Sequence, residues 1–168
     1  MKKFIKLLTI SVCVALMSVN LEAKEDNMQE LIKKGTLGGF KGDSKIFSGE
    51  VNVDMAFKAN EWRDFSGGIV TFSKGARSAW HTHPKGQTLF VLDGTIITGT
   101  KTGQIQIAKK GDTISCPPNL EHWHGALDSQ SGTHLALTSQ IDGKNVNWLK
   151  KVSDKEYKKA LEKAKETK

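Results

Sequence analysis

The sequence predicts an all-β domain, a barrel or a sandwich built from many short strands. Its 168 residues suffice for one domain with tails. Short apolar runs recur along the chain from residue 51 to residue 139, and Gly-containing turns separate them. This pattern is typical of a barrel or sandwich and not of a βαβ fold. A Lys-, Glu- and Ala-rich segment at the C-terminal end predicts one short helix.

Two strands are predicted ahead of the histidine-rich region, at residues 51–57 and 69–72. Residues 51–57 alternate between apolar and polar side chains, which is the period of a half-buried strand. Residues 69–72 are entered and left through Gly-containing turns. The preceding N-terminal segment, residues 24–46, is polar, and we expect one or two helical turns within it at residues 28–34.

The remaining strands follow one another with short connections. Asp93-Gly94 is the dipeptide most typical of a hairpin turn. Pro84 and the pair Pro117-Pro118 end the strands before them, because proline cannot donate to a strand ladder. We therefore expect strands at residues 79–83, 87–92, 95–100, 104–108, 113–116, 122–127 and 133–139.

Residues 1–23 have the pattern of a secretory signal peptide. Lysines precede the apolar run at residues 7–19, and Ala23 offers a small residue before a cleavage site. The run is shorter than the ~20 apolar residues of a membrane span, although an uncleaved anchor is the alternative. We therefore expect a periplasmic or secreted protein without stable membrane association.

The positive charge lies mainly at the two ends of the chain. The net charge is +7, and residues 150–168 supply +4 of it through eight lysines and four acidic residues. The body, residues 24–149, carries only +1. A nucleic-acid-binding surface is therefore not expected. Residues 153–156 read Ser-Asp-Lys-Glu, a capping box that begins the predicted helical tail.

Cys116 is the only cysteine after residues 1–23, which excludes an internal disulfide in the mature chain. We expect its thiol to be buried rather than reactive. Trp80 and Trp123 stand next to histidines and are expected to point away from any cavity. Arg77 could bind a substrate carboxylate or form a surface ion pair. Two other tryptophans are expected in the core or an interface, Trp62 and Trp148.

All five histidines lie in the predicted strand region, and four of them form two His-x-His pairs. Residues i and i+2 of a strand point to the same face, so His81 and His83 direct two imidazoles into one cavity. His122 supplies a third imidazole, with His124 beside it, and Gln87 offers a carbonyl oxygen from the next strand. Imidazole binds transition metals. The cluster therefore favours a metal site over unrelated core histidines.

The spacing of these residues also resembles the two motifs of the cupin family, and the matching positions are Gly75, His81, His83, Gln87 and Gly94, then Gly111, Pro117, Asn119 and His122. The resemblance covers roughly residues 47–140. It implies a cupin-type double-stranded β-helix barrel, or jelly roll, at residues 47–149. Two positions depart from the family pattern, because Gln87 stands where most cupins have Glu and Ala126 where the second motif usually has Asn.

Within that family, AWHTHPKGQTLFVLDG and PPNLEHWHGA resemble the small bacterial cupins that include manganese-dependent hydroxynitrile lyases. The resemblance implies four metal ligands, His81, His83, Gln87 and His122. It also implies that two further histidines, His124 and His134, line the cavity as catalytic residues. A purely structural role is the alternative for each of these two.

The amide at Gln87 has a chemical consequence of its own. A Glu would offset one unit of the charge of a bound ion, whereas a neutral ligand set leaves a stronger Lewis acid. Such a set does less to stabilise a higher oxidation state, which weighs against oxygenase chemistry. We expect one divalent transition metal ion per chain. The resemblance favours manganese or iron, and zinc or nickel fit the same donors.

These observations favour metal-dependent acid–base chemistry, of lyase or isomerase type, on a small carbonyl or hydroxy compound such as a cyanohydrin. His124 would take or return a proton, and His134 would orient the leaving or incoming group. The alternatives are an iron-dependent dioxygenase and a non-catalytic cupin that binds a ligand or metal. A homodimer is expected, because such barrels cover open edges by exchanging N-terminal strands, here residues 47–57.

Overall fold

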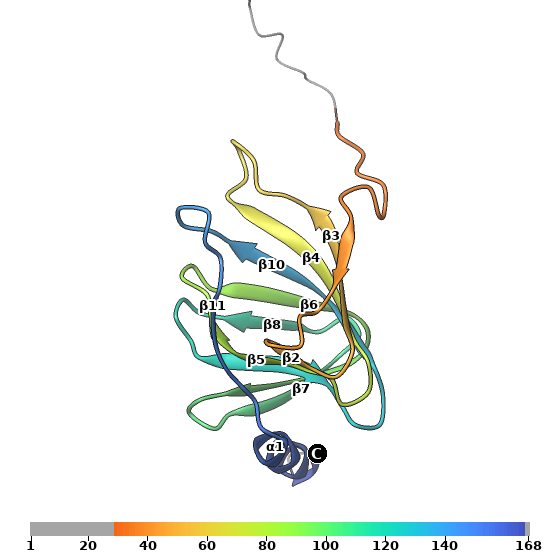
Figure 1. Ribbon diagram of the computed structural model, residues 1–168, viewed down its shortest axis with the longest axis vertical. Helices are drawn as coiled ribbons and strands as arrows, with labels where there is room; N and C mark the ends of the chain where they lie inside the picture. Colours follow the sequence, from red (N-terminus) through yellow and green to blue (C-terminus); the bar gives the residue numbers. More distant parts are fainter. Residues whose placement is uncertain (1–28, 167–168) are drawn as a thin grey trace, which may run out of the picture. The chain divides into compact units, whose positions relative to one another are not determined.

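The computed structural model describes residues 29–166 and confirms the all-β class. From Leu31 onward the chain forms one compact unit. In this unit a curled sheet surrounds the core, and one helix, α1 (Asp154–Glu166), lies at the bottom of the view in Figure 1. The predicted signal peptide, residues 1–23, lies outside the described residues. Between residues 29 and 166, no helix is long and apolar enough to cross a membrane.

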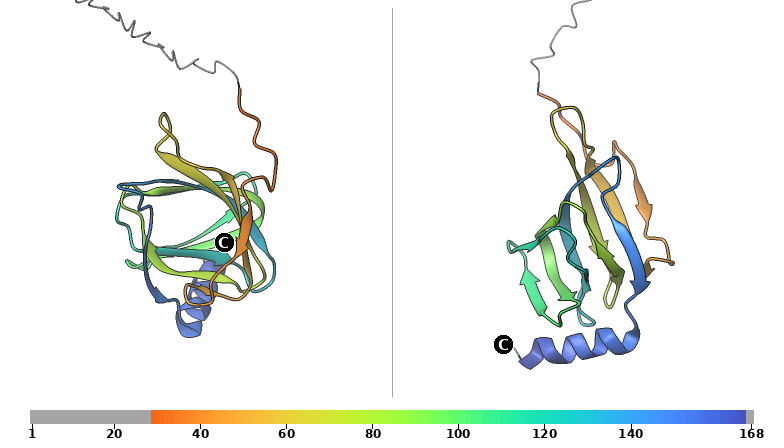
Figure 2. Two further views of the ribbon diagram at one scale, coloured as in Figure 1. Left: turned by 45° about the horizontal axis from the view of Figure 1, so that its top comes forward. Right: turned by 90° about the vertical axis from the view of Figure 1, so that its left-hand side faces the viewer.

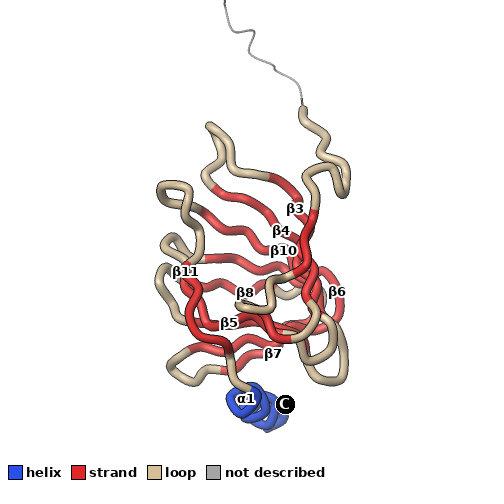
Figure 3. The backbone as a smooth tube through the Cα atoms, in the orientation of Figure 1, coloured by secondary structure: helices blue, strands red, loops and turns tan. Residues whose placement is uncertain are grey.

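The described residues contain the strands β1 (Gly39–Lys41), β2 (Phe47–Ser48), β3 (Val51–Phe57), β4 (Phe65–Phe72), β5 (Arg77–Thr82), β6 (Gln87–Thr100), β7 (Ile105–Lys109), β8 (Thr113–Cys116), β9 (His122–Ala126), β10 (Gly132–Ser139) and β11 (Asn147–Lys151). All pairs are antiparallel, and Figure 3 shows the strands in red. One half of the sheet has the order β1-β3-β4-β10-β6-β8. The other has the order β7-β6-β9-β5-β11, with β2 also on β5. The two halves face each other across the core (Figure 2).

Strand β6 runs without a break through the residues predicted to form a hairpin turn. Gly94 has a φ of +63°, and a Cβ there would clash with the carbonyl oxygen of Ser131. Leu92 has no partner on β10, because the register shifts by one residue beside it. Up to Gly94, β6 pairs with β8 and β10, and from Thr95 onward it pairs with β7 and β9. The predicted hairpin at Asp93-Gly94 is therefore wrong, and the bulge carries one strand from one half of the sheet to the other.

Two apolar clusters hold the fold together. The inner cluster fills the space between the two halves of the sheet with side chains such as Phe72, Leu89 and Ile96, which are fully buried. The outer cluster joins α1 to Trp80 and Trp123 on the opposite face of β5 and β9. The prediction that both tryptophans point away from the cavity is therefore confirmed.

Helix α1 begins and docks as its sequence predicts. The backbone N–H of Ser153 donates to the Glu156 carboxylate at 2.8 Å, and the Glu156 N–H donates to Ser153 Oγ at 3.2 Å. This is the predicted capping box. One helix face is buried against the outer cluster through Tyr157, Ala160, Leu161 and Ala164.

The N-terminal segment differs from its prediction. No helix forms within the described part of residues 28–34. Instead, Gly35 and Gly38 adopt φ angles of +83° and +75° in two successive turns. Leu31 is 82% exposed and does not contribute to the core. Trp62 is 77% exposed and therefore does not lie in the core. Its predicted place in an interface stays a prediction.

Candidate metal centre

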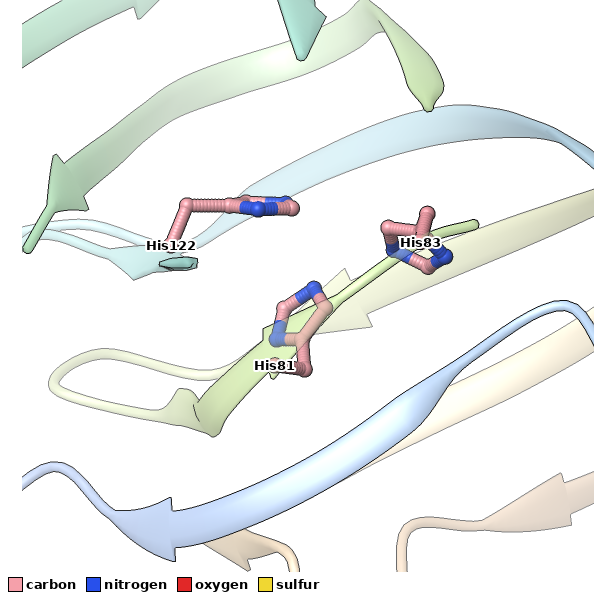
Figure 4. Close-up of side chains that lie close together, drawn as sticks. All are labelled: His81, His83 and His122. Atoms are coloured by element: carbon pink, nitrogen blue, oxygen red, sulfur yellow. The ribbon is translucent and has the colours of Figure 1, made fainter. Parts of the chain in front are cut away.

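Three of the predicted ligands come from two neighbouring strands and face one point (Figure 4). His81 lies in β5 and pairs directly with His122, the first residue of β9. His83 follows the end of β5, on the same side as His81. One ring nitrogen from each histidine lies within 4.8 Å of the other two, and all three residues are buried. This group could hold a metal ion.

Backbone carbonyls determine which ring nitrogen of each ligand is free. Nδ1–H of each ring donates to a backbone carbonyl, His81 to Ala79 at 2.9 Å, His83 to Asn145 at 2.6 Å and His122 to Leu120 at 2.9 Å. With Nδ1 protonated, Nε2 carries the lone pair that binds a metal. Nε2 of His83 is buried without a hydrogen-bond partner. An unused buried lone pair of this kind fits a ligand atom.

Gln87 lies at the start of β6, where its amide reaches the three histidines. Its Nε2–H donates to Thr138 Oγ1 at 3.2 Å, which turns Oε1 toward His122 Nε2, 3.4 Å away. Both of these facing atoms carry lone pairs, so they make no hydrogen bond with each other. A cation between them would satisfy both. The donor atoms present therefore fit a bound metal ion.

The imidazoles are held in the neutral form that a metal requires. Burial, and after it the nearby His122, holds the pKa of His81 well below its usual range. Burial also lowers the pKa values of His83 and His122. Three neutral nitrogens and one amide oxygen form a donor set that suits a divalent transition ion.

His124 and His134 form a second imidazole pair beside this group. Nε2 of His134 lies 3.1 Å from Nδ1 of His124, and Phe72 packs against both rings. Burial lowers the pKa of His134 to about 3 and holds that of His124 well below its usual range. His124 borders the cavity, whereas His134 lies behind it. His134 can therefore act on a bound molecule through His124.

His81, His83 and Gln87 border a cavity of about 300 Å³ between the two halves of the sheet. None of the described residues that line it carries a formal charge. Apart from the histidines and Gln87, most of its wall is apolar and includes Phe47, Met55, Val70 and Trp148. A small, neutral and mainly apolar molecule with one polar end fits such a cavity.

Arg77 is not among the residues that line the cavity, and of its two predicted roles the ion pair is the one present, with the exposed Asp154 as its partner. Its guanidinium is buried, donates to the carbonyl of Val152 at 3.2 Å and pairs with Asp154 at 2.5 Å. Cys116 is buried as predicted, and burial raises the pKa of its thiol to about 11. Both residues are structural.

Comparison with known proteins identifies the family. A family model described as a cupin domain matches residues 68–137. An (R)-mandelonitrile lyase from Granulicella tundricola is 39% identical over 129 residues, which cover 77% of this chain and 98% of that protein. The chain belongs to the cupin family. The predicted cupin-type fold is thus confirmed.

Solved structures agree with this assignment. A cupin-like protein from Thermotoga maritima has a TM-score of 0.69 and 34% identity to this cupin, over 80% of this chain and 98% of that chain. A polyketide cyclase from Streptomyces resistomycificus has a TM-score of 0.59 at 15% identity, over 78% of this chain and 92% of its own. The second likeness concerns the fold alone.

Proposed function

We propose that this cupin is a metal-dependent lyase that breaks or forms a carbon–carbon bond beside a hydroxyl group in a small neutral molecule of the cyanohydrin type. The observation that carries the proposal is the neutral group of three histidines and Gln87 at an uncharged, mainly apolar cavity, with His124 beside it as a spare imidazole. The similarity to an (R)-mandelonitrile lyase supports the reaction class.

The ligands in this proposal are Nε2 of three histidines and Oε1 of Gln87, and the histidines are His81, His83 and His122. A divalent ion held by these neutral groups would supply a Lewis acid toward a substrate oxygen. We propose manganese or iron on the basis of the family resemblance, and the donor set also accepts zinc or nickel.

His124 is the group that exchanges a proton with the substrate in this proposal. Cleavage of a cyanohydrin removes the hydroxyl proton, breaks the carbon–carbon bond and delivers a proton to the departing cyanide. One imidazole at the cavity can take and return that proton. When His124 is protonated, its Nδ1–H faces Nε2 of His134 at 3.1 Å, and the hydrogen bond stabilises the positive charge.

The proposal is tested by assaying aldehyde release from aromatic and aliphatic cyanohydrins, with metal content matched between variants. His124→Ala should lower turnover by about 10²–10⁴-fold, the usual range for a lost acid–base group. Gln106→Ala, at an exposed position of β7, is the matched control and should leave turnover unchanged. Wild-type cleavage no faster than that of the free ion would remove the lyase proposal.

The same assay separates the two alternative functions. Oxygen consumption that depends on the substrate would support an iron-dependent dioxygenase. A firmly bound metal without turnover of any substrate would support a cupin that binds a ligand or metal without catalysis.

We also propose that residues 1–23 direct export to the periplasm or beyond, and that the mature protein is a homodimer. Export is supported by the lysines, the apolar run and Ala23 at its end. N-terminal sequencing of the native protein tests export, and light scattering tests the dimer. Neither proposal affects the chemistry of the metal centre.

A further inference from the structure

A segment near the C-terminal end lies directly against the metal ligands. We call residues 145–152 the strap; it includes β11 and leads into α1. It pairs with β5, and Trp148 stands opposite His81 in the register. The strap lies outside residues 68–137, which the cupin family model matches.

The strap contacts two of the three histidine ligands. The carbonyl of Asn145 accepts the Nδ1–H bond of His83 at 2.6 Å. The indole of Trp148 packs on the ring of His81 with their centroids 4.9 Å apart, and the ring of Phe47 packs edge-on against the indole with centroids 5.6 Å apart. Asn145 and Trp148 also line the cavity. The strap is therefore a wall of the cavity and a support for its ligands.

The far end of the strap is fixed by buried interactions. Val152 is 1% exposed and belongs to the outer cluster with α1. Its carbonyl accepts two bonds from the Arg77 guanidinium, each at 3.2 Å. The same guanidinium lies over the ring of Tyr157, whose hydroxyl donates to the carbonyl of Ala126 at 2.7 Å. Helix α1 thus anchors the strap to β5 and β9, the two strands that carry the ligands.

We propose that the strap orients two ligands of the metal centre. Asn145 is the positioning residue for His83, and Trp148 is the positioning residue for His81. Ligand rings that are held in place bind a metal more tightly, because less side-chain freedom is lost on binding. By thermodynamic linkage, metal binding must in turn stabilise the strap. This inference rests on the metal-binding part of the proposed function and is independent of the reaction.

The first test measures the Kd for Mn²⁺ in the full chain. Trp148→Ala should weaken binding about 10-fold, the lower end of the effect of partners that orient metal ligands. Trp148→Phe keeps an aromatic ring against His81 and should restore most of the affinity. Leu149→Ala, at the neighbouring exposed position of the strap, is the matched control and should bind as the wild type does. Thermal unfolding of each metal-free variant verifies that it is folded.

The outcomes distinguish this inference from the proposed function. A wild type that binds no Mn²⁺ would contradict both the metal centre and the strap. If the wild type binds Mn²⁺, two results would overturn the positioning role alone. The first is a Kd of Trp148→Ala equal to that of the wild type, and the second is a Kd of Leu149→Ala raised as much as that of Trp148→Ala.

The second test is hydrogen exchange of the wild type with and without Mn²⁺, and it includes the Asn145 contact. Amides of residues 145–151 should exchange more slowly in the loaded protein, whereas those of β7, which contributes no ligand, should not change. Equal exchange of the strap in the two states, at saturating Mn²⁺, would show that the strap and the metal are not linked.

Discussion

His134 illustrates how strongly burial determines the chemistry of a single residue. Its side chain is fully buried and contacts Phe72 and His124. Burial lowers its pKa to about 3, against an ordinary value near 6.5. The unfolded chain therefore binds a proton between these two pH values that the folded protein does not. Stability is complete above pH ~6.5 and falls as the pH drops below that value.

The metal-free protein should accordingly lose stability on mild acidification, and His134 should account for part of the loss. From pH 7.5 to pH 5 its share is about 2 kcal/mol, since each pH unit below ~6.5 removes about 1.4 kcal/mol. Urea unfolding of the wild type and of His134→Gln at both pH values measures this share. His134→Gln should have a lower free energy of unfolding than the wild type at pH 7.5, but it should lose less of that free energy between pH 7.5 and pH 5. An equal loss in both proteins would contradict the assignment.

The elements of the fold differ in how far the sequence predicts them. Strand β3 and the start of α1 follow their patterns, because apolar alternation and a capping box are local signals. Strand β11 has no such signal, since its residues are mostly exposed and it forms only by pairing with β5. The continuous β6 was missed because the bulge depends on where Ser131 lies in the fold.

The same distinction holds in the candidate metal centre. Histidine spacing and the cupin resemblance predict the residues that the structure brings together. The groups that orient them are the carbonyls of Ala79, Asn145 and Leu120, and the hydroxyl of Thr138. Every residue has a carbonyl, so no sequence pattern marks the ones that accept these bonds.

At the junction of β5 and α1, the two partners of one ion pair lie in different surroundings. The Arg77 side chain is 7% exposed, whereas that of Asp154 is 89% exposed. The bonds from Arg77 to the Val152 carbonyl are shielded from water, whereas the contact with Asp154 is screened. The buried bonds therefore account for most of the contribution of this junction to stability.

Arg77→Met should lower the free energy of unfolding by about 2–3 kcal/mol, because it removes charged donors and leaves a buried carbonyl without them. Asp154→Asn should cost at most about 1 kcal/mol, from the exposed pair and the helix N-terminus. Denaturant unfolding at neutral pH compares the two variants. Equal losses would show that the ion pair, and not the bonds to Val152, fixes the end of the strap.

In the molecule as a whole, the charged side chains of the described residues lie outside the cavity at the candidate metal centre. The chain has a net charge of +7, yet none of the described residues that line the cavity is charged. The two halves of the cupin sheet enclose this neutral space, and β5, β6 and β9 bring the ligands to it from separate parts of the sequence. Before any proton transfer, the only full charge at the site would be that of a bound ion, which is the basis of the proposed chemistry.

Metal content of the purified, Mn²⁺-loaded and desalted protein tests this account most directly. The wild type should retain about one divalent ion per chain, as a single four-ligand site would. His122→Ala should lose most of the ion, because it removes a ligand, whereas His124→Ala should retain it. A wild type without retained metal, or a His124→Ala variant as empty as His122→Ala, would contradict the division between ligands and proton-transfer residue on which the proposed function depends.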